Sequence, residues 1–327
     1  MEREISVFSK LDPSFGYDIV IGTHPGIFHA DEVVAISLLH LYYECENIGV
    51  MRTYNLKELH ECDLLVDIGG GELDHHQAGG NGSRQNGIKY ASAGLVWKKF
   101  GEKIVDKLAN KVEGKLNKFQ ISSVASQIDD EYIQAIDETD NGVCCDNELF
   151  YYIEAFLPDW YCCDNRTLNE NFSKAVKITI EILERLIRKA IEKEASYHWM
   201  ISSLASNHSR ILEVPAQTFP WQEALLIFNG YFDPHVDFVI FPYPAAFPPE
   251  GWGAQCVPPN MTQPFEKRIP FPKSWAGQTD KLPEISGIPD AVFCHNNCFL
   301  VCGNTKEAVI KMCEKAIEIF ENSKKSK

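Results

Sequence analysis

The chain of 327 residues lacks the features that would place it in a membrane or outside the cell. No apolar run reaches about 18 residues without a charge, so we expect no membrane span. The first residues contain no apolar core of a signal peptide, and Glu2 and Glu4 are untypical of an Arg-rich transit peptide. We therefore expect an intracellular protein, resident in the cytoplasm or the nucleus.

Cys-x-x-Cys pairs are also absent, which argues against a zinc ribbon or a thioredoxin motif. The chain has 11 cysteines, an odd number, and we expect reduced thiols in a reducing compartment. Cys294, Cys298 and Cys302 recur every four residues but lie among strand-like residues. We interpret these three as packing residues.

Basic residues are few, with 31 Lys and Arg against 46 Asp and Glu and a formal net charge of -15. This balance argues against binding of nucleic acid through a broad basic surface. It leaves a nuclease open, because carboxylates that bind divalent cations count as negative in this sum but are neutralised in the working protein. With 45% hydrophobic residues the chain can form a core, and its length predicts two domains at about 150 residues each.

The first part of the chain alternates between apolar strand patterns and helical patterns. Residues 17–22, 48–53 and 64–68 are typical of buried strands, and residues 33–43 are typical of a buried helix. This order predicts an α/β fold whose parallel sheet is flanked by helices. Ligands of such sheets bind beyond the carboxyl ends of the strands, so the loops after Gly22 and Val66 are the places to look.

The rest of the chain predicts a long helix followed by a smaller domain. Residues 172–197 form a long amphipathic pattern, and the segments after it resemble strands between Pro-rich loops. We expect a catalytic domain over residues 1–168, a linker helix over 169–200 and a C-terminal mixed α/β domain over 201–327. The glycine-rich residues 78–87 predict a surface loop that packs little. Further helices are expected at residues 92–100, with Ser92 as N-cap, at 122–136 and at 305–322, and further strands at 210–214, 236–241 and 291–301.

Histidines and aspartates fall at the predicted strand and helix ends. Each has an ordinary explanation when taken alone, since Asp31 could cap the helix that follows it, and Asp67 and Asp140 could be turn residues. The adjacent His75 and His76 have no packing explanation. The complete set is His24, His29 and Asp31 after the first strand, Asp67 at the third strand, Asp74, His75 and His76 beyond it, and Asp140 at a helix end.

Taken together, these residues match the needs of phosphoester hydrolysis by two divalent ions. Such a pair of ions lies about 3.5 to 4 Å apart and lowers the pKa of a water molecule to near neutrality. It requires several carboxylate oxygens, one of them bridging, with imidazoles at the remaining positions. This ligand mixture predicts two Mn²⁺ ions, or Mg²⁺ ions with fewer nitrogen ligands.

The motifs THxGxFHxDE, VDIGG, DHH, SAGLVW, DxxDNG and, near the end, SGIP followed by FCHNNCFLVCGNTKE occur in order from about Ile21 to Ala308. In this set the chain resembles the melanocyte proliferating gene family of metal-dependent exonucleases, distant relatives of the DHH phosphoesterases. The resemblance implies a DHH-type N-terminal domain, a C-terminal domain that helps to hold substrate, and 3′-to-5′ exonuclease activity on RNA, as in animal members. It also allows a mitochondrial residence.

The resemblance implies a role for each residue of the set. His24, His29 and Asp31 correspond to the first metal motif, Asp67 to the bridging carboxylate, and His75 and Asp140 to further ligands. His76 would face the scissile phosphate, and Asp74 would orient a histidine. His29 stands where the wider superfamily has an Asp, which should favour manganese over magnesium.

The second domain offers candidates for binding phosphate or sugar. Lys306 lies at the start of the last predicted helix, where free backbone N–H groups favour an anion, although a solvated lysine beside a helix cap is an equal alternative. Trp252 and Trp275 could stack on bases, but aromatic residues in Pro-rich loops more often pack the loop down. The candidates are Arg210, His295, Asn297, Gly303, Asn304 and Lys306.

The sequence thus predicts a metal-dependent phosphodiesterase, a 3′-to-5′ exonuclease acting on RNA or short oligonucleotides. Two alternatives remain open: a small-molecule phosphatase or pyrophosphatase with the same ligand set, and a metal-bound scaffold that binds RNA without catalysis. No pattern in the sequence specifies an oligomeric state.

Overall fold

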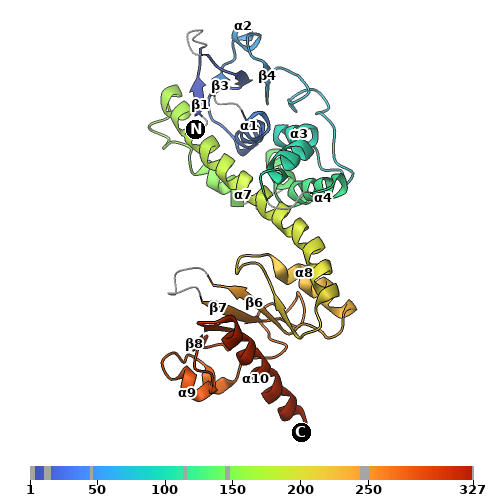
Figure 1. Ribbon diagram of the computed structural model, residues 1–327. Helices are drawn as coiled ribbons and strands as arrows, with labels where there is room; N and C mark the ends of the chain where they lie inside the picture. Colours follow the sequence, from blue (N-terminus) through green and yellow to red (C-terminus); the bar gives the residue numbers. More distant parts are fainter. Residues whose placement is uncertain are drawn as a thin grey trace. The chain divides into compact units, whose positions relative to one another are not determined.

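The computed structural model describes residues 4–10, 16–44, 47–112, 116–143, 148–243 and 251–325. The chain divides into two compact units, Met1–Ile191 and Glu192–Lys327, each of which has its own sheet (Figure 1). The expected boundaries at residues 168 and 200 lie on either side of the division between the two units.

The sheet of the first unit contains four parallel strands in the order β1-β3-β2-β4. The strands are β1 (Glu4–Phe8), β2 (Ile19–Thr23), β3 (Asn47–Arg52) and β4 (Leu64–Leu65). All five residues of β2 are buried, as expected for a central strand covered on both faces. The predicted α/β class with a parallel sheet is confirmed. Strand β1, which has no counterpart among the predicted strands, adds an edge to this sheet.

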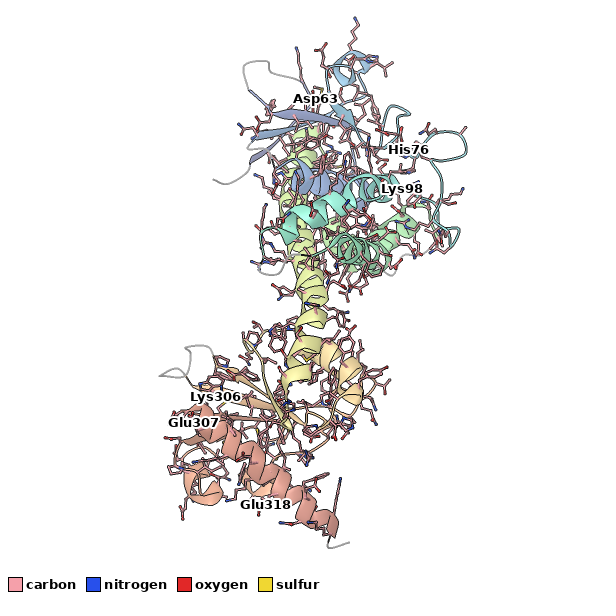
Figure 2. The ribbon with its side chains drawn as sticks, turned by 45° about the vertical axis from the view of Figure 1, so that its right-hand side comes forward. Asp63, His76, Lys98, Lys306, Glu307 and Glu318 are labelled. Atoms are coloured by element: carbon pink, nitrogen blue, oxygen red, sulfur yellow. The ribbon has the colours of Figure 1, made fainter. Side chains whose placement is uncertain are left out.

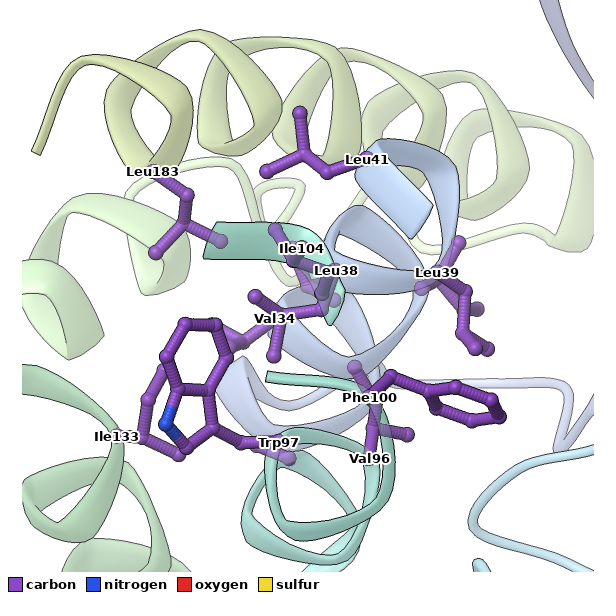
Figure 3. Packing of buried hydrophobic residues seen from close by; sticks show 14 of the residues in the cluster. Val34, Leu38, Leu39, Leu41, Val96, Trp97, Phe100, Ile104, Ile133 and Leu183 are labelled. Atoms are coloured by element: carbon purple, nitrogen blue, oxygen red, sulfur yellow. The ribbon is translucent and has the colours of Figure 1, made fainter. Parts of the chain in front are cut away.

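Helices cover this sheet, and the most deeply buried is α1 (Ala30–Tyr43). Twelve consecutive residues of α1 are buried, which explains why its sequence is apolar on all sides. It packs against α3 (Ser92–Ala109), and Figure 3 shows Val34 of α1, Trp97 of α3 and Leu183 in one cluster. The other helices of the unit are α2 (Leu56–Leu59), α4 (Lys118–Ile128), a π-helix (Asp129–Ile133), α5 (Gln134–Asp140) and α6 (Glu148–Glu154).

The predicted long helix is α7 (Asn165–Ser206), which is longer at both ends than its amphipathic pattern indicated. Phe172, Val176 and Ile187 of α7 are completely buried in the core of the first unit. Met200 and Leu204 belong to a core of the second unit. The helix is therefore a structural part of both units.

The second unit contains a mixed five-stranded sheet in the order β5-β6-β7-β9-β8, in which only β5 and β6 pair in parallel. The segment predicted as one strand over 291–301 is instead a hairpin, and Cys298 has a φ of 53° in its turn. The elements are β5 (Ile211–Glu213), α8 (Trp221–Phe228), a 3-10 turn (Asn229–Tyr231), β6 (Phe238–Pro242), β7 (Trp252–Cys256), a 3-10 turn (Lys273–Trp275), α9 (Leu282–Ser286), β8 (Ala291–Cys294), β9 (Leu300–Gly303) and α10 (Lys306–Lys325).

The cysteines of the described residues are free thiols, as expected, and five of these eight are buried. The remaining cysteines of the sequence, Cys45, Cys144 and Cys145, lie outside the described residues. Among the helices that the structure describes, none combines the length and apolar character needed to cross a bilayer.

Candidate metal centre

The candidate ligands gather beyond the carboxyl ends of two neighbouring parallel strands. His24 directly follows β2, and Asp67 follows β4, which pairs with β2. His29 is the N-cap of α1, and Asp31 lies in the first turn of that helix. The parallel order of the sheet therefore brings residues far apart in the sequence to one edge, as the strand pattern predicts.

The first group of possible ligands consists of His24, His29, Glu32 and Asp67, whose ligand atoms all lie within 4.8 Å of one another. The Nε2 atom of His24 lies 3.1 Å from Oε1 of Glu32 and 3.3 Å from Oδ2 of Asp67. Glu32 was not among the predicted ligands. Its position three residues after the N-cap suggests a capping box, and its carboxylate does accept the backbone N–H of His29 at 2.9 and 3.0 Å.

Two further groups adjoin the first. One consists of Asp67, His75 and His76, and the other of Asp31, His75 and Asp140. The Nε2 atom of His75 lies 3.0 Å from Oδ2 of Asp140, and its Nδ1 atom lies 3.4 Å from Oδ1 of Asp67. Asp67 is thus common to the first and second groups and His75 to the second and third. The three groups form a continuous row of nitrogen and oxygen donors.

Asp67 occupies an unusual backbone conformation. Its φ is 58°, in the left-handed region that residues with a Cβ seldom adopt and that Asp and Asn tolerate best. The backbone N–H of Asp67 donates to the carbonyl of Leu73, and its Oδ1 atom accepts the hydroxyl of Ser92 at 3.1 Å. Backbone strain of this kind persists only where the surrounding contacts enforce it and is frequent at functional sites.

Asp31 is held by the first turn of α3. Its two carboxylate oxygens accept the backbone N–H groups of Ser92 at 2.9 Å and Ala93 at 2.6 Å. The expectation that Ser92 caps this helix is wrong, because Ala91 is the N-cap and Asp31 satisfies the free N–H groups. Asp31 therefore does cap a helix, but this helix is α3 and not α1, to which Asp31 belongs.

Asp74 and His76 form a hydrogen-bonded pair. The Oδ1 atom of Asp74 lies 2.9 Å from the backbone N of His76 and 3.0 Å from its Nδ1 atom, and Oδ2 accepts the N–H of Gly70 at 2.7 Å. Burial alone would raise the pKa of Asp74, but these donors lower it below its usual value. The imidazole of His76 is 60% exposed and projects from the loop before α3 (Figure 2). Asp74 thus fixes the ring of an accessible histidine.

A buried arginine ties the glycine-rich loop to the helix that carries Asp140. Arg84 forms two hydrogen bonds to Asp129 at 2.6 and 2.7 Å and one to Asp137 at 2.6 Å. Asp129 opens the π-helix, a distortion that often marks functional sites, and Asp137 precedes Asp140 by one turn in α5. The expectation that residues 78–87 pack little is wrong at Arg84, which is only 9% exposed.

A second buried arginine holds the loop between His24 and His29. The Nε atom of Arg52 donates to the carbonyl of His24 at 3.2 Å, and its Nη2 atom donates to the carbonyl of Gly26 at 2.8 Å. Its NH1 group donates to Asn169 of α7, and its guanidinium lies over the ring of Phe172, 4.4 Å from the centroid. Burial lowers the pKa of Arg52 to about 10, so it remains a cation at neutral pH.

The chemistry of the donor set fits divalent cations. Burial, reinforced by the charges of Asp67, Asp140 and Asp137, raises the pKa of Asp31 well above its usual value. Burial would lower the pKa of His24, but hydrogen bonds to Asp67 and Glu32 raise it to about 11. Such a concentration of buried carboxylates is unfavourable without cations, and carboxylates with imidazoles are suitable ligands for divalent metals. These residues can therefore hold metal ions.

Two pockets open onto this row of donors and share His29 and His76. The Phe150 pocket has a volume of about 450 Å³ and is also lined by Asp31, His75, Asp140, Phe150 and Glu154. The Tyr54 pocket has a volume of about 350 Å³ and is also lined by His24, Tyr54, Asp67, Gly69 and Asp74. Each pocket therefore reaches a different group of possible ligands.

The predicted substrate-binding residues lie in the second unit, where most have structural partners. Arg210 pairs with Asp237 at 2.6 Å and with Glu321 at 2.9 Å. Lys306 lies at the start of α10 (Figure 2). It pairs with Glu213 and lies over the ring of Trp252. Trp275 is 2% exposed and cannot stack on a base.

The remaining candidates of this unit lie in its hairpin and at the end of β9. His295 accepts the backbone N–H of Asn297 within the hairpin turn. A Cβ on Gly303 would lie 3.1 Å from that of Ala308 and 3.2 Å from the carbonyl of Asp290, whose oxygen accepts the N–H of Asn304. Close packing is thus sufficient to explain why position 303 is a glycine. A role of these residues in substrate binding stays a prediction.

Comparison with known proteins gives matches along most of the chain. The family model MYG1_exonuc, described as an uncharacterised protein family (UPF0160), matches residues 20–317. The MYG1 exonuclease of Mus musculus is 29% identical over 328 residues, covering 89% of this chain and 83% of the mouse protein. The MYG1 proteins of Caenorhabditis elegans and Schizosaccharomyces pombe are 27% and 28% identical, covering 93% of this chain in each case and 96% and 99% of those proteins.

Proposed function

The chain belongs to the MYG1 exonuclease family, UPF0160, and from this premise we propose that it is a metal-dependent phosphodiesterase that degrades RNA or short oligonucleotides from the 3′ end. The match confirms the resemblance predicted from the motifs. The family name and the cluster of His and Asp side chains support a metal-dependent, nuclease-like hydrolase. The substrate, the direction and the number of ions are our proposals.

The observation that carries the proposal is the continuous row of donors through Asp67. We assign His24, His29 and Asp67 to one divalent ion, and Asp67, Asp31, His75 and Asp140 to a second. Asp67 would bridge the two, because it belongs to the first donor group, its Oδ1 atom lies 3.4 Å from Nδ1 of His75 in the second set, and it is only 3% exposed. Glu32, whose carboxylate contacts His24 and His29, would orient these two histidines or complete the first set of ligands.

Divalent ions bound here would neutralise charge on the phosphate and supply a nucleophilic hydroxide near neutral pH. The chain itself contributes orientation and proton transfer. When the Nδ1–H of His76 donates to Asp74, its Nε2 atom accepts a hydrogen bond in the neutral ring and donates one in the imidazolium. His76 can therefore protonate the leaving oxygen as a general acid, and Asp74 orients its ring for this role.

The proposal is tested with RNA carrying a label at either end, incubated with Mn²⁺ or Mg²⁺. A 3′-to-5′ exonuclease releases a labelled mononucleotide at once from 3′-labelled RNA and produces a descending ladder from 5′-labelled RNA. We expect higher activity with Mn²⁺, because imidazole ligands favour it over Mg²⁺. RNA that stays intact with every metal, or faster phosphate release from pyrophosphate, would reject the proposal.

The Asp67→Asn variant separates an enzyme from a scaffold that binds RNA without catalysis. Asn tolerates the left-handed backbone at this position but lacks the charge needed to bridge two cations. We expect the variant to lose turnover while it retains the fold. An unchanged rate in Asp67→Asn would contradict the role of this residue. Binding of RNA without turnover in both proteins would favour the scaffold.

A further inference from the structure

The two pockets place one aromatic ring on each side of the donor row. Phe150 belongs to the pocket that reaches Asp31, His75 and Asp140, and Tyr54 belongs to the pocket that reaches His24 and Asp67. His29 and His76 line both pockets. A phosphodiester bound at these shared histidines would therefore have one pocket on each side of the scissile phosphate.

Contacts hold the ring of Phe150 and the chain on both sides of Tyr54. Phe150 packs against the core of the first unit, and its ring centroid lies 5.5 Å from that of Tyr151 in an edge-to-face contact. Tyr54 is 70% exposed, although its neighbours are fixed: the N–H of Thr53 donates to Thr23, and that of Asn55 donates to the hydroxyl of Thr53. A ring held by such contacts is a suitable platform for a flat partner, because little side-chain entropy is lost on contact.

The charges of the pockets disfavour small polyanions. Among the described residues that line the two pockets there is no Lys or Arg, whereas Asp31, Asp67, Asp74, Asp140 and Glu154 contribute carboxylates. Pyrophosphate would place its charge among these carboxylates, and no Lys or Arg among the described lining residues would balance it. The neutral base and sugar of a nucleoside suit such walls better, and a base gains contact energy by stacking on an aromatic ring.

We infer that these two pockets receive the two nucleosides that flank the scissile phosphate, with one base on Phe150 and the other on Tyr54. The inference rests on the proposed phosphodiesterase function and specifies its substrate as a chain that has a base on each side of the reacting bond. The volumes of about 450 and 350 Å³ lie within the usual range of small-ligand sites, roughly 300 to 1,000 Å³. Binding then comes from stacking, in agreement with the acidic surroundings.

The test compares short RNAs that differ only in their bases. One RNA has all its bases, one lacks the base of the last nucleotide, and one lacks that of the nucleotide before it. Loss of either base should lower kcat/KM of the wild-type protein about 5- to 150-fold, the range expected for a base stacked on an aromatic ring. The sugar-phosphate backbone is the same in all three, so metal binding and phosphate contacts are unchanged.

The variants Phe150→Leu and Tyr54→Leu assign each base to a pocket. Leucine keeps apolar volume but removes the ring face. On RNA with all its bases, kcat/KM of each variant should therefore fall by about the same factor as when a base is missing. In one leucine variant, kcat/KM should no longer depend on the base of the last nucleotide. In the other, it should no longer depend on the base of the nucleotide before it. Phe150→Tyr and Tyr54→Phe retain a ring, so their kcat/KM should stay near that of the wild type. Phe119→Leu on α4 is the control, because Phe119 is 82% exposed and lines neither pocket.

The outcomes separate this inference from the function on which it rests. If wild-type protein cleaves none of the RNAs with Mn²⁺, the proposed function is wrong. If it cleaves all three with equal kcat/KM, the function stands and the inference is overturned without the use of any variant. The inference is also overturned if both leucine variants bind Mn²⁺ normally and respond to the missing bases as the wild type does.

Discussion

Gly94 and Asp137 approach one another so closely that a Cβ on Gly94 would lie 1.9 Å from Oδ2 of Asp137. The backbone N–H of Gly94 donates to Oδ1 of the same carboxylate at 2.9 Å. This contact joins the first turn of α3, whose N–H groups hold Asp31, to the helix that ends at Asp140. Two of the proposed metal ligands are thus positioned through one glycine.

The Gly94→Ala variant should displace Asp137 and separate these two elements. Overpacking and a lost buried hydrogen bond together should lower the free energy of unfolding by about 2 to 4 kcal/mol, measured by urea denaturation. Mn²⁺ affinity should fall as well. Gly230→Ala is a matched control, because a Cβ there would meet no atom within 4 Å and should change stability by less than about 0.5 kcal/mol. Equal stabilities of the two variants would contradict this account.

Removal of the Arg84 guanidinium should leave Asp137 buried without its cation. We expect Arg84→Met to lower the free energy of unfolding by about 3 to 5 kcal/mol, the usual cost of breaking a buried ion pair on one side. Arg166→Met removes an arginine whose side chain is 89% exposed and should leave stability almost unchanged. Thermal denaturation in EDTA measures both effects without a contribution from metal. Similar melting temperatures would show that the Arg84 contacts are unimportant.

Arg52 should act on metal binding without touching the metal. Arg52→Lys keeps a positive charge but cannot donate to His24, Gly26 and Asn169 in the fork geometry of a guanidinium. Loss of such supporting contacts typically weakens metal affinity about 10- to 100-fold. Isothermal titration with Mn²⁺ measures the change. A dissociation constant equal to that of the wild type would mean that the loop holds His24 without Arg52.

The metal-free protein should lose stability as the pH rises. The folded pKa of His24, about 11, lies above its usual value of 6.5, because Asp67 and Glu32 stabilise the imidazolium. The contribution of His24 to the free energy of unfolding is therefore complete below pH 6.5 and is lost as the pH rises toward 11. Asp31, whose pKa is also raised, acts in the same direction as its proton leaves. We expect the melting temperature in EDTA to fall between pH 7 and pH 10.

The His24→Gln variant should show a weaker fall over this range, because it lacks the titrating ring. Metal should reverse the trend, since binding requires deprotonated ligands and becomes stronger as the pH rises. The increase in melting temperature that Mn²⁺ gives the wild type should thus be larger at pH 8 than at pH 6. A melting temperature in EDTA that does not change with pH, or an identical slope in His24→Gln, would argue against the imidazolium contacts.

The sequence predicts the architecture of the first unit well, because buried parallel strands have a simple apolar pattern. Most residues of the three groups of possible ligands were among the predicted site residues, since His24 directly follows β2 and Asp67 lies two residues after β4. Glu32 was missed because an acidic residue in the first turn of a helix has a sufficient local reason. Arg84 was missed because the glycines around it suggest an unpacked loop, whereas its partners lie 45 and 53 residues away in the sequence.

In the second unit the sequence was less informative. Strand β7 lies next to a Pro-rich segment and carries a glycine, so its propensity is weak and its pairing with β6 and β9 decides its structure. The turn between β8 and β9 has no glycine at its left-handed position, which Cys298 occupies, and only His295, Asn296 and Asn297 interrupt the apolar pattern on its two sides. The pairing of β7 with β9, about 50 residues away, is information that a local pattern does not contain.

Anomalous diffraction from crystals soaked in Mn²⁺ tests the central claim most directly, because it counts the ions and identifies their ligands. We predict two manganese ions bridged by Asp67, one bound by His24 and His29 and the other by Asp31, His75 and Asp140. Manganese bound elsewhere, or no ion at this edge of the sheet at millimolar concentration, would contradict the account.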